Sequence, residues 1–285
     1  FKILGKADLG TVPIEKPENT QIVKCKNCKA IYVTPMPIWN KTDFDKLYNN
    51  ADTYFPESDK WLKMRETEIV ENRFRRIQKA IRTEDKVLLE MGAGIKAFMA
   101  KYLYKKGWNV VLQEPSVEFS KVLKVENPSF DLITDLFFDI DSKNKFSLIY
   151  IDSVMEHVAN PVDYVKKSAE LLKSGGILYF ISPNEHSFRN WARTIMKNMK
   201  GDKISAYLCP YNIPYHLIGF SRKSIEILAD ESGLELVKHI HRYDYDWFHL
   251  IKNKHNILKY PVSALLYFVD LVGWGCNQEI ILRKK

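Results

Sequence analysis

The chain has 285 residues, of which 46% are hydrophobic and 27% charged, and a formal net charge of +8. This length and balance are typical of a soluble protein with one sizeable domain and an appendage, or with two small domains. They exclude a membrane-spanning protein, because no apolar run reaches the roughly 18 residues that a span requires.

The distribution of charge and the cysteines exclude two further classes. Basic residues are interleaved with acids, as in KWLKMRETEIVENRFRRIQKA, which is typical of a solvated helix face rather than of a phosphate-binding track. Four cysteines with one Cys-x-x-Cys pair do not suggest a secreted disulfide scaffold. We therefore expect a cytoplasmic protein that binds neither nucleic acid nor membranes. Because the chain begins with Phe1, we expect it to be a fragment or a trimmed chain.

The first half of the chain predicts an irregular segment followed by an α/β core. Residues 1–50 contain the cysteine pair and scattered prolines, and residues 58–82 have the apolar spacing of a helix. From residue 84, short apolar runs alternate with helical patterns, which predicts a parallel sheet wound with helices. The expected strands are 87–91, 110–113, 130–134, 147–152 and 177–182, and the expected helices are 95–106, 117–124 and 161–173.

The pattern changes after Pro183. Residues 184–220 form a long aromatic insertion with an amphipathic piece, which we expect to be a lid. The segments SRKSIEILADESG, LELVKHIHRY and EIILRK then predict a capped helix and two strands. We expect two parts, a Cys-pair segment at 1–50 that resembles part of a zinc ribbon, and a main domain at 51–285.

An acid and two glycines follow the first apolar strand, in KVLLEMGAGIKAFMAKYL. Gly92-x-Gly94-x-x-Ala97 is similar to a dinucleotide-binding turn, although Lys96 stands where a third glycine often lies. The carboxylate of Glu90 would disfavour a pyrophosphate by on the order of 1 kcal/mol at an effective dielectric constant near 20. A ligand with a positive end, such as the ammonium and sulfonium of S-adenosylmethionine, would instead be favoured.

Glu114 ends the second expected strand, in NVVLQEPS, about 20 residues after the glycine turn. An acid at this position accepts hydrogen bonds from ribose hydroxyls. Because NAD and S-adenosylmethionine both contain this ribose, Glu114 does not distinguish them. The alternative is a surface acid that caps the helix begun by Pro115-Ser116.

The segment FSLIYIDSVMEHVANPVDYVKKSAELLKSGGILYFISPN supplies the distinction. It resembles class I S-adenosylmethionine-dependent methyltransferases that have EHV and a proline after the fourth strand and LLKxGGxLxxxxPN at the fifth. VLLEMGAGIKAFMAKYLYKKGWNVVLQEPS is similar to the first half of that family. The resemblance covers roughly residues 60–285 and implies a Rossmann-like, doubly wound, seven-stranded, mostly parallel sheet with an irregular N-terminal segment and a lid insertion.

The resemblance also implies S-adenosylmethionine as the cofactor and places residues around it. The Glu-x-Gly-x-Gly turn would contact the methionine part, and the acid after the second strand, with its neighbour, the ribose. The segment after the third strand would line the adenine, and the end of the fourth strand would lie under the sulfonium. The residues concerned are Glu90, Gly92, Ala93, Gly94, Glu114, Pro115, Asp135, Leu136, Asp152 and Ser153.

Three residues are candidates for catalysis at the acceptor: His216, His157 and Tyr215. Members of the family often carry a histidine shortly before a Phe-Ser that caps the next helix, and Ser221 fits that cap. Histidine can act as a general base near neutral pH. His216 is the first candidate and His157 the second. Alternatively, Glu156 and His157 only start a turn, and His216 is a structural histidine of an aromatic loop.

Cys25-x-x-Cys28, in VKCKNCKAIYVTPMP, has the spacing of half a tetrahedral zinc site. Relatives that methylate sugars, including sugar nucleotides, carry two such pairs before a similar xYxxPxP segment. Either a first pair lies upstream of Phe1, or the knuckle has lost its metal. We expect no metal in this chain.

These observations together predict transfer of a methyl group from S-adenosylmethionine to a small-molecule acceptor, such as a sugar or sugar nucleotide. An NAD-dependent oxidoreductase and a non-catalytic S-adenosylmethionine-binding protein are alternatives. Nucleic-acid methylation is a lesser one, because the chain has no Asn/Asp-Pro-Pro-Tyr/Phe signature. The sequence does not specify the acceptor atom or the oligomeric state.

Overall fold

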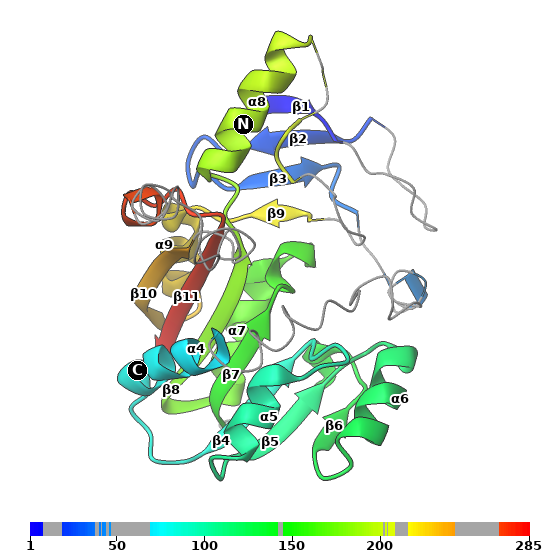
Figure 1. Cartoon of the computed structure of the whole chain (residues 1–285), viewed down its shortest axis with the longest axis vertical. Coiled ribbons are helices and arrows are strands. Elements are labelled where there is room, and N and C mark those ends of the chain that lie inside the picture. The colour runs from blue at the N-terminus through cyan, green and yellow to red at the C-terminus, as the bar shows by residue number, and fades with distance from the viewer. Residues whose placement is uncertain are drawn as a thin grey trace, which may run out of the picture.

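The structure is a computed structural model that contains two sheets (Figure 1). It describes residues 1–7, 19–37, 40, 42, 43, 46, 69–141, 145–201, 203, 205–208, 216–242 and 268–285. The larger sheet has seven strands in the order β10-β11-β8-β7-β4-β5-β6, and the smaller has four in the order β1-β2-β3-β9.

The larger sheet is mostly parallel, as the sequence predicts. Its strands are β4 (Val87–Met91), β5 (Asn109–Gln113), β6 (Asp131–Ile133), β7 (Phe146–Asp152), β8 (Leu172–Pro183), β10 (Leu234–Arg242) and β11 (Asn277–Lys284). Strands β8, β7, β4, β5 and β6 run parallel, and β11 pairs antiparallel with both β8 and β10. The carboxyl ends of five strands therefore meet at one edge, where ligands bind in this architecture.

Helices cover both faces of this sheet. They are α4 (Val70–Ala80), α5 (Phe98–Tyr104), α6 (Val117–Glu126), α7 (Pro161–Leu171) and α9 (Arg222–Glu231). Successive strand residues enter opposite cores: Leu148 packs in the cluster with α4 and α5, and Ile149 packs in the cluster with α7 and α9. The continuous apolar runs of the central strands follow from this two-sided burial.

The expected helix over 95–106 is shorter in the structure, where α5 begins at Phe98. Ala97 has a left-handed backbone with φ of 44°, so the helix cannot extend back through it. Ala97, and not Lys96, is thus the third residue of the glycine turn with a left-handed backbone. Helices α6, α8 and α9 have ordinary serine caps, because Ser116, Ser187 and Ser221 each accept a backbone N–H of the helix that follows.

The N-terminal segment is more regular than its sequence predicts. Strands β1 (Lys2–Lys6), β2 (Gln21–Lys24) and β3 (Ile31–Thr34) form an antiparallel sheet, which β9 (Ile218–Gly219) completes. Since β9 comes from the segment next to the expected lid, the pairing joins the Cys-pair segment to the main fold. The strands are short and depend on this distant partner, which is why local patterns did not reveal them.

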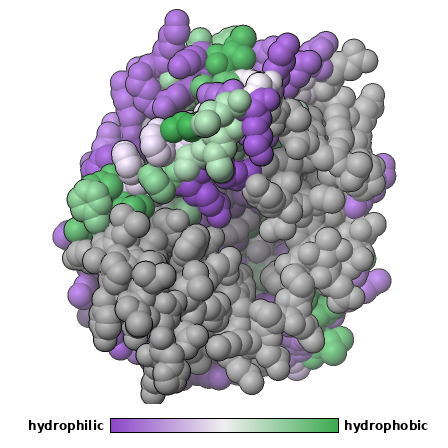
Figure 2. All heavy atoms as spheres, turned by 45° about the horizontal axis from the view of Figure 1, so that its top comes forward, coloured by the Kyte–Doolittle hydropathy of each residue, from purple (hydrophilic) through white to green (hydrophobic). Residues whose placement is uncertain are grey.

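The amphipathic piece of the insertion is α8 (Phe188–Met199), which lies beside β1 and β2 in Figure 1. Figure 2 shows green apolar side chains among purple hydrophilic ones on the face of the molecule where these elements come forward. Exposed apolar residues of α8 are Trp191, Ile195, Met196 and Met199. No helix in the described part of the chain is long and apolar enough to cross a membrane.

Candidate active site

The glycine turn after β4 is held in a backbone shape that favours glycine. Gly92 and Gly94 have φ of 59° and 57°, in the left-handed region. A Cβ added to Gly92 would lie 2.6 Å from Val154 Cγ2, so the turn packs directly against the segment that follows β7. The Ala93 N–H donates to the Gln113 carbonyl at 3.1 Å, which ties the turn to the end of β5.

Glu114 is a buried acid that closes this turn. Its Oε2 accepts the Gly94 N–H at 2.9 Å and its Oε1 accepts the Ser116 N–H at 3.0 Å. Burial raises the pKa of Glu114 to about 7, although these two donors act to lower it. Glu114 is only 6% exposed, so it is not the surface acid that the alternative interpretation expected. The contact to Ser116 at the start of α6, which that interpretation also expected, is present.

Gln113 is a further buried polar residue, which the sequence reasoning missed. Its Oε1 accepts the Gly92 N–H at 3.2 Å, and its Nε2 donates to the Asp135 carbonyl at 2.9 Å. One side chain therefore joins the loops after β4, β5 and β6. Asp135 is exposed and Leu136 half-buried at this edge, just before the 3-10 turn η2 (Phe137–Asp139).

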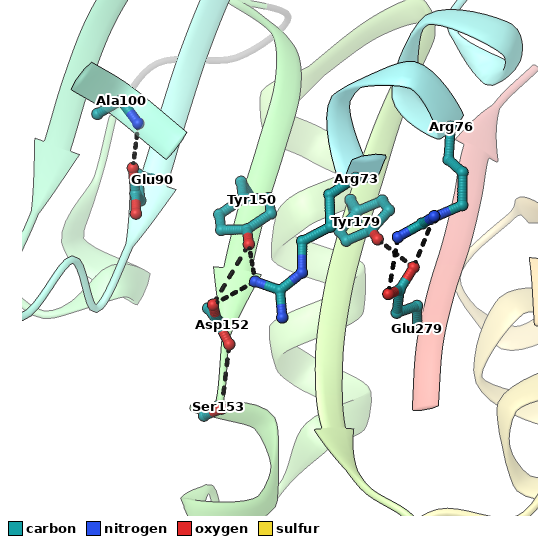
Figure 3. Close-up of polar contacts among 9 residues, drawn as sticks. All are labelled: Arg73, Arg76, Glu90, Ala100, Tyr150, Asp152, Ser153, Tyr179 and Glu279. Atoms are coloured by element: carbon teal, nitrogen blue, oxygen red, sulfur yellow. Dashed lines mark hydrogen bonds and ion pairs between the residues drawn. The ribbon is translucent and has the colours of Figure 1, made fainter. Parts of the chain in front are cut away.

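Glu90 lies near the end of β4 and is 6% exposed. Its Oε2 accepts the Ala100 N–H at 2.7 Å, in the first turn of α5 (Figure 3). A carboxylate at a helix N-terminus is stabilised by the unpaired N–H groups there. The acid expected from the sequence is thus buried near the end of β4, and one of its oxygens caps α5.

Asp152 ends β7 and pairs with an arginine from α4. Arg73 Nη1 donates to Asp152 Oδ2 at 2.7 Å and to the Tyr150 hydroxyl at 2.7 Å, as Figure 3 shows. The Ser153 hydroxyl donates to the other oxygen, Oδ1, at 3.1 Å. Asp152 keeps 18% of its side chain exposed, against 9% for Arg73, so the sulfonium side of the expected pocket carries a carboxylate that is already paired.

A second arginine of α4 makes a similar pair deeper in the sheet. Arg76 forms an ion pair with Glu279, in which Nη2 donates to Oε1 at 2.9 Å, and the Tyr179 hydroxyl donates to Oε2 at 2.5 Å. One buried arginine, Arg73, and one half-buried arginine, Arg76, thus lie on the face of α4 that packs on the sheet. The sequence signal for Arg73 was its position on the apolar face predicted for this helix, between Val70 and Ile77. An arginine that is buried there needs an acid as its partner.

The 3-10 turn η3 (Met155–His157) carries a second constellation. Glu156 Oε1 lies 3.9 Å from His157 Nε2 and 4.0 Å from His216 Nε2, and the two histidine rings are 5.0 Å apart. His216 reaches this place because the Leu217 N–H donates to the Glu156 carbonyl at 2.6 Å. The structure therefore brings together the two histidine candidates, whereas Tyr215 lies outside the described residues.

Burial dominates the protonation of this constellation. It raises the pKa of Glu156 to about 8, with nearby Asp152 and Glu185 acting in the same direction. Burial also lowers the pKa of His216 to about 3, helped by His157 and Arg189. His216 is consequently a neutral ring at physiological pH, with a nitrogen lone pair that can coordinate a cation, and its low pKa makes it a weak base.

The residues at the carboxyl edge fit a ligand with a positive end and hydroxyl donors. Glu90, Glu114 and Asp152 supply carboxylate oxygens around the turn. The Gly92 backbone packs so closely against Val154 that a Cβ would not fit there. S-adenosylmethionine has an ammonium, a sulfonium and ribose hydroxyls, which match carboxylate acceptors better than a pyrophosphate would. This edge therefore has the character of an S-adenosylmethionine site in an α/β enzyme.

The comparisons with known proteins agree with this class. A family described as a methyltransferase domain matches residues 63–239, more than half of the chain, and the chain belongs to that family. The protein is a class I methyltransferase that uses S-adenosylmethionine as its methyl donor. The match favours methyl transfer over the NAD-dependent alternative. No curated protein sequence matches the chain.

Several solved structures are similar to the chain in fold. The magnesium protoporphyrin IX methyltransferase of Synechocystis PCC 6803, solved with bound SAH, is 10% identical with a TM-score of 0.55, covering 86% of this chain and 99% of its own. The cyclase SpnF is 13% identical with a TM-score of 0.54, covering 87% and 98%. A SAM-dependent methyltransferase from Leishmania major is 16% identical with a TM-score of 0.51, covering 84% and 80%. At these identities the likeness establishes the fold alone.

Proposed function

We propose that this methyltransferase acts on a small-molecule acceptor, and that the acceptor binds beside Glu156, His157 and His216. The observation that carries the proposal is the position of these residues. They follow β7 directly, and Val154, two residues before Glu156, packs on Gly92 of the cofactor turn. An acceptor there would lie next to the methyl donor, which is the arrangement that an in-line transfer requires.

The cofactor half of the site is assigned as the sequence predicts. Glu114 would accept the ribose hydroxyls beside Pro115, with the glycine turn, including Ala93, along the methionine part. Asp135 and Leu136 would line the adenine, and Asp152 and Ser153 would face the sulfonium. Glu90 would favour the positive end of the ligand by its charge while it fixes α5. What supports these roles is the placement of all these residues at one edge of the sheet.

The chain's own residues have two tasks in the reaction. S-adenosylmethionine, when bound, supplies an electrophilic methyl group. The protein must hold the acceptor in line and, where the acceptor carries a proton on its attacking atom, take that proton. His216 is the first candidate for this transfer and His157 the second, and Tyr215, which lies outside the described residues, stays a predicted third candidate.

A sugar or sugar nucleotide is the acceptor class that the Cys-pair segment favours, by resemblance to the sugar-methylating branch. Two contacts support a working role for this segment at 1–50: the Ser221 hydroxyl donates to the Cys28 carbonyl at 2.5 Å, and β9, just after His216, pairs with β3. We retain the main domain at 51–285 with its lid at 184–220. The cytoplasmic location stays a prediction from the cysteine content of the sequence.

A labelled-methyl assay on pools of small acceptors, sugar nucleotides included, tests the proposal by a mass gain of one methyl group. His216→Ala should lower turnover at least tenfold and change cofactor affinity less than twofold, because the residue faces the acceptor. His239→Ala is the matched control, since His239 lies on β10 and bonds to Gln278. Wild-type turnover in His216→Ala would move the proton transfer elsewhere.

A further inference from the structure

We propose that Glu156, His157 and His216 bind one divalent transition-metal ion. Each residue offers one ligand atom, and the three atoms lie within 4.8 Å of one another. The ligands come from two segments far apart in the sequence, the turn after β7 and the strand β9 region, which the Leu217–Glu156 backbone bond holds together. The inference deepens the proposed function, because the ion would lie where we place the acceptor.

The observation that points to a ligand is the carboxylate of Glu156. The residue is 1% exposed, and in the described part of the chain neither of its side-chain oxygens has a hydrogen-bond partner. Buried polar groups in native proteins nearly always have a partner, and a buried carboxyl group without one is destabilising even when it is protonated. By contrast, Glu114 and Glu185, also buried, each accept two hydrogen bonds. A cation between Glu156 and the histidines would remove this cost.

The distances suit ligands around an ion better than a direct bond. Separations of 3.9 and 4.0 Å from Glu156 Oε1 to the two Nε2 atoms are too long for hydrogen bonds. Ligands at about 2.1 Å from a tetrahedral ion are roughly 3.4 Å apart, so Glu156 Oε1 would approach each Nε2 by about half an ångström, and no pair within the 4.8 Å cluster would close by more than about 1.4 Å. The charged neighbours are mixed, because Asp152 is paired with Arg73 and Arg189 acts on His216, so the ligand atoms themselves carry the argument for a cation.

The ligand set indicates the kind of ion. Two imidazoles and one carboxylate suit Zn²⁺, Fe²⁺, Co²⁺ or Mn²⁺, whereas Mg²⁺ and Ca²⁺ prefer oxygen ligands alone. Three protein ligands leave at least one position open, as in catalytic metal sites. An acceptor hydroxyl or enolate-type oxygen could occupy that position, which would orient it toward the methyl donor. While an ion is bound, His216 and His157 would serve as its ligands, so the proton transfer proposed above for these histidines applies to the metal-free chain.

The test uses untagged, chelator-treated full-length chain titrated with Co²⁺, followed by its visible absorption, and with Zn²⁺ by calorimetry. We expect one equivalent per chain with protein-dependent cobalt bands and a rise in Tm. Glu156→Gln and His216→Ala should each weaken the affinity at least tenfold. His239→Ala and the double variant Cys25→Ser/Cys28→Ser should retain the equivalent, which separates this site from the cysteine pair.

Three results would overturn the inference: no stoichiometric binding to the folded wild type, unchanged affinity in both ligand variants, or loss of the equivalent in the cysteine double variant. Circular dichroism of each variant shows whether it is folded, and the wild-type titration decides the question if a variant is not. S-adenosylmethionine binding is measured on the same samples. Intact cofactor binding without metal binding would reject the metal site and leave the proposed function in place.

Discussion

Two buried carboxylates, Glu114 in the cofactor half of the site and Glu156 in the acceptor half, are satisfied in opposite ways. Glu114 accepts N–H groups from Gly94 and Ser116, so its loops are fixed before any ligand binds. Glu156 is as deeply buried, yet within the described residues its two oxygens have no hydrogen-bond donor. In the proposed site, therefore, the half assigned to the cofactor is preorganised, whereas the half assigned to the acceptor is the one that a ligand would complete.

The largest effect is expected at the boundary between the two halves. Arg73→Leu removes the partner of Asp152 and leaves the carboxylate beside the buried Tyr150 hydroxyl. Breaking a buried ion pair from one side should lower the free energy of unfolding by about 3 kcal/mol, measured by urea denaturation. Arg75→Leu on the same helix is the control, because its pair with Glu71 is exposed and should matter by less than about 0.5 kcal/mol. Equal losses in the two variants would mean that the Arg73 pair is not effectively buried.

A smaller effect is expected from pH, which should change the affinity for S-adenosylmethionine through the ionisation of Glu114. Glu114 accepts hydrogen bonds from the ribose hydroxyls in its ionised form. Burial raises the pKa of Glu114 to about 7, so below that pH the carboxyl group must release a proton when the cofactor binds. Affinity for S-adenosylmethionine should therefore rise about tenfold from pH 6 to pH 8, since each pKa unit corresponds to about 1.4 kcal/mol. Calorimetry on Glu114→Gln, in which this proton is absent, isolates the residue from the ligand's own amino group. A wild-type profile no steeper than that of the variant would contradict the ribose assignment.

The central sheet was predictable because its strands are buried on both faces. The runs that became β4 and β7 are continuous and apolar, so their positions and parallel order followed from local patterns and from the resemblance. The positions of Glu90, Glu114 and Asp152 at the strand ends were predicted from the same patterns and resemblance. The strands β1, β2 and β3 did not, because their sheet depends on β9, which lies far along the chain.

The residues that the sequence reasoning missed act through distant partners. Gln113 joins three loops, and Arg73 reaches Asp152 from another helix. The approach of His216 to Glu156 joins a residue of the expected lid to the turn after β7. No pattern within a short window contains these relationships, whereas the spacing of a glycine turn is entirely local.

Calorimetric titration of Glu114→Ala and Glu156→Gln with S-adenosylmethionine, in metal-free buffer, tests the division of the site most directly. Glu114→Ala should weaken binding at least tenfold, because it loses charged hydrogen bonds to the ribose. Glu156→Gln should remain within twofold of wild type, because that carboxylate serves the acceptor side. Equal weakening in both variants, or an effect confined to Glu156→Gln, would contradict the account.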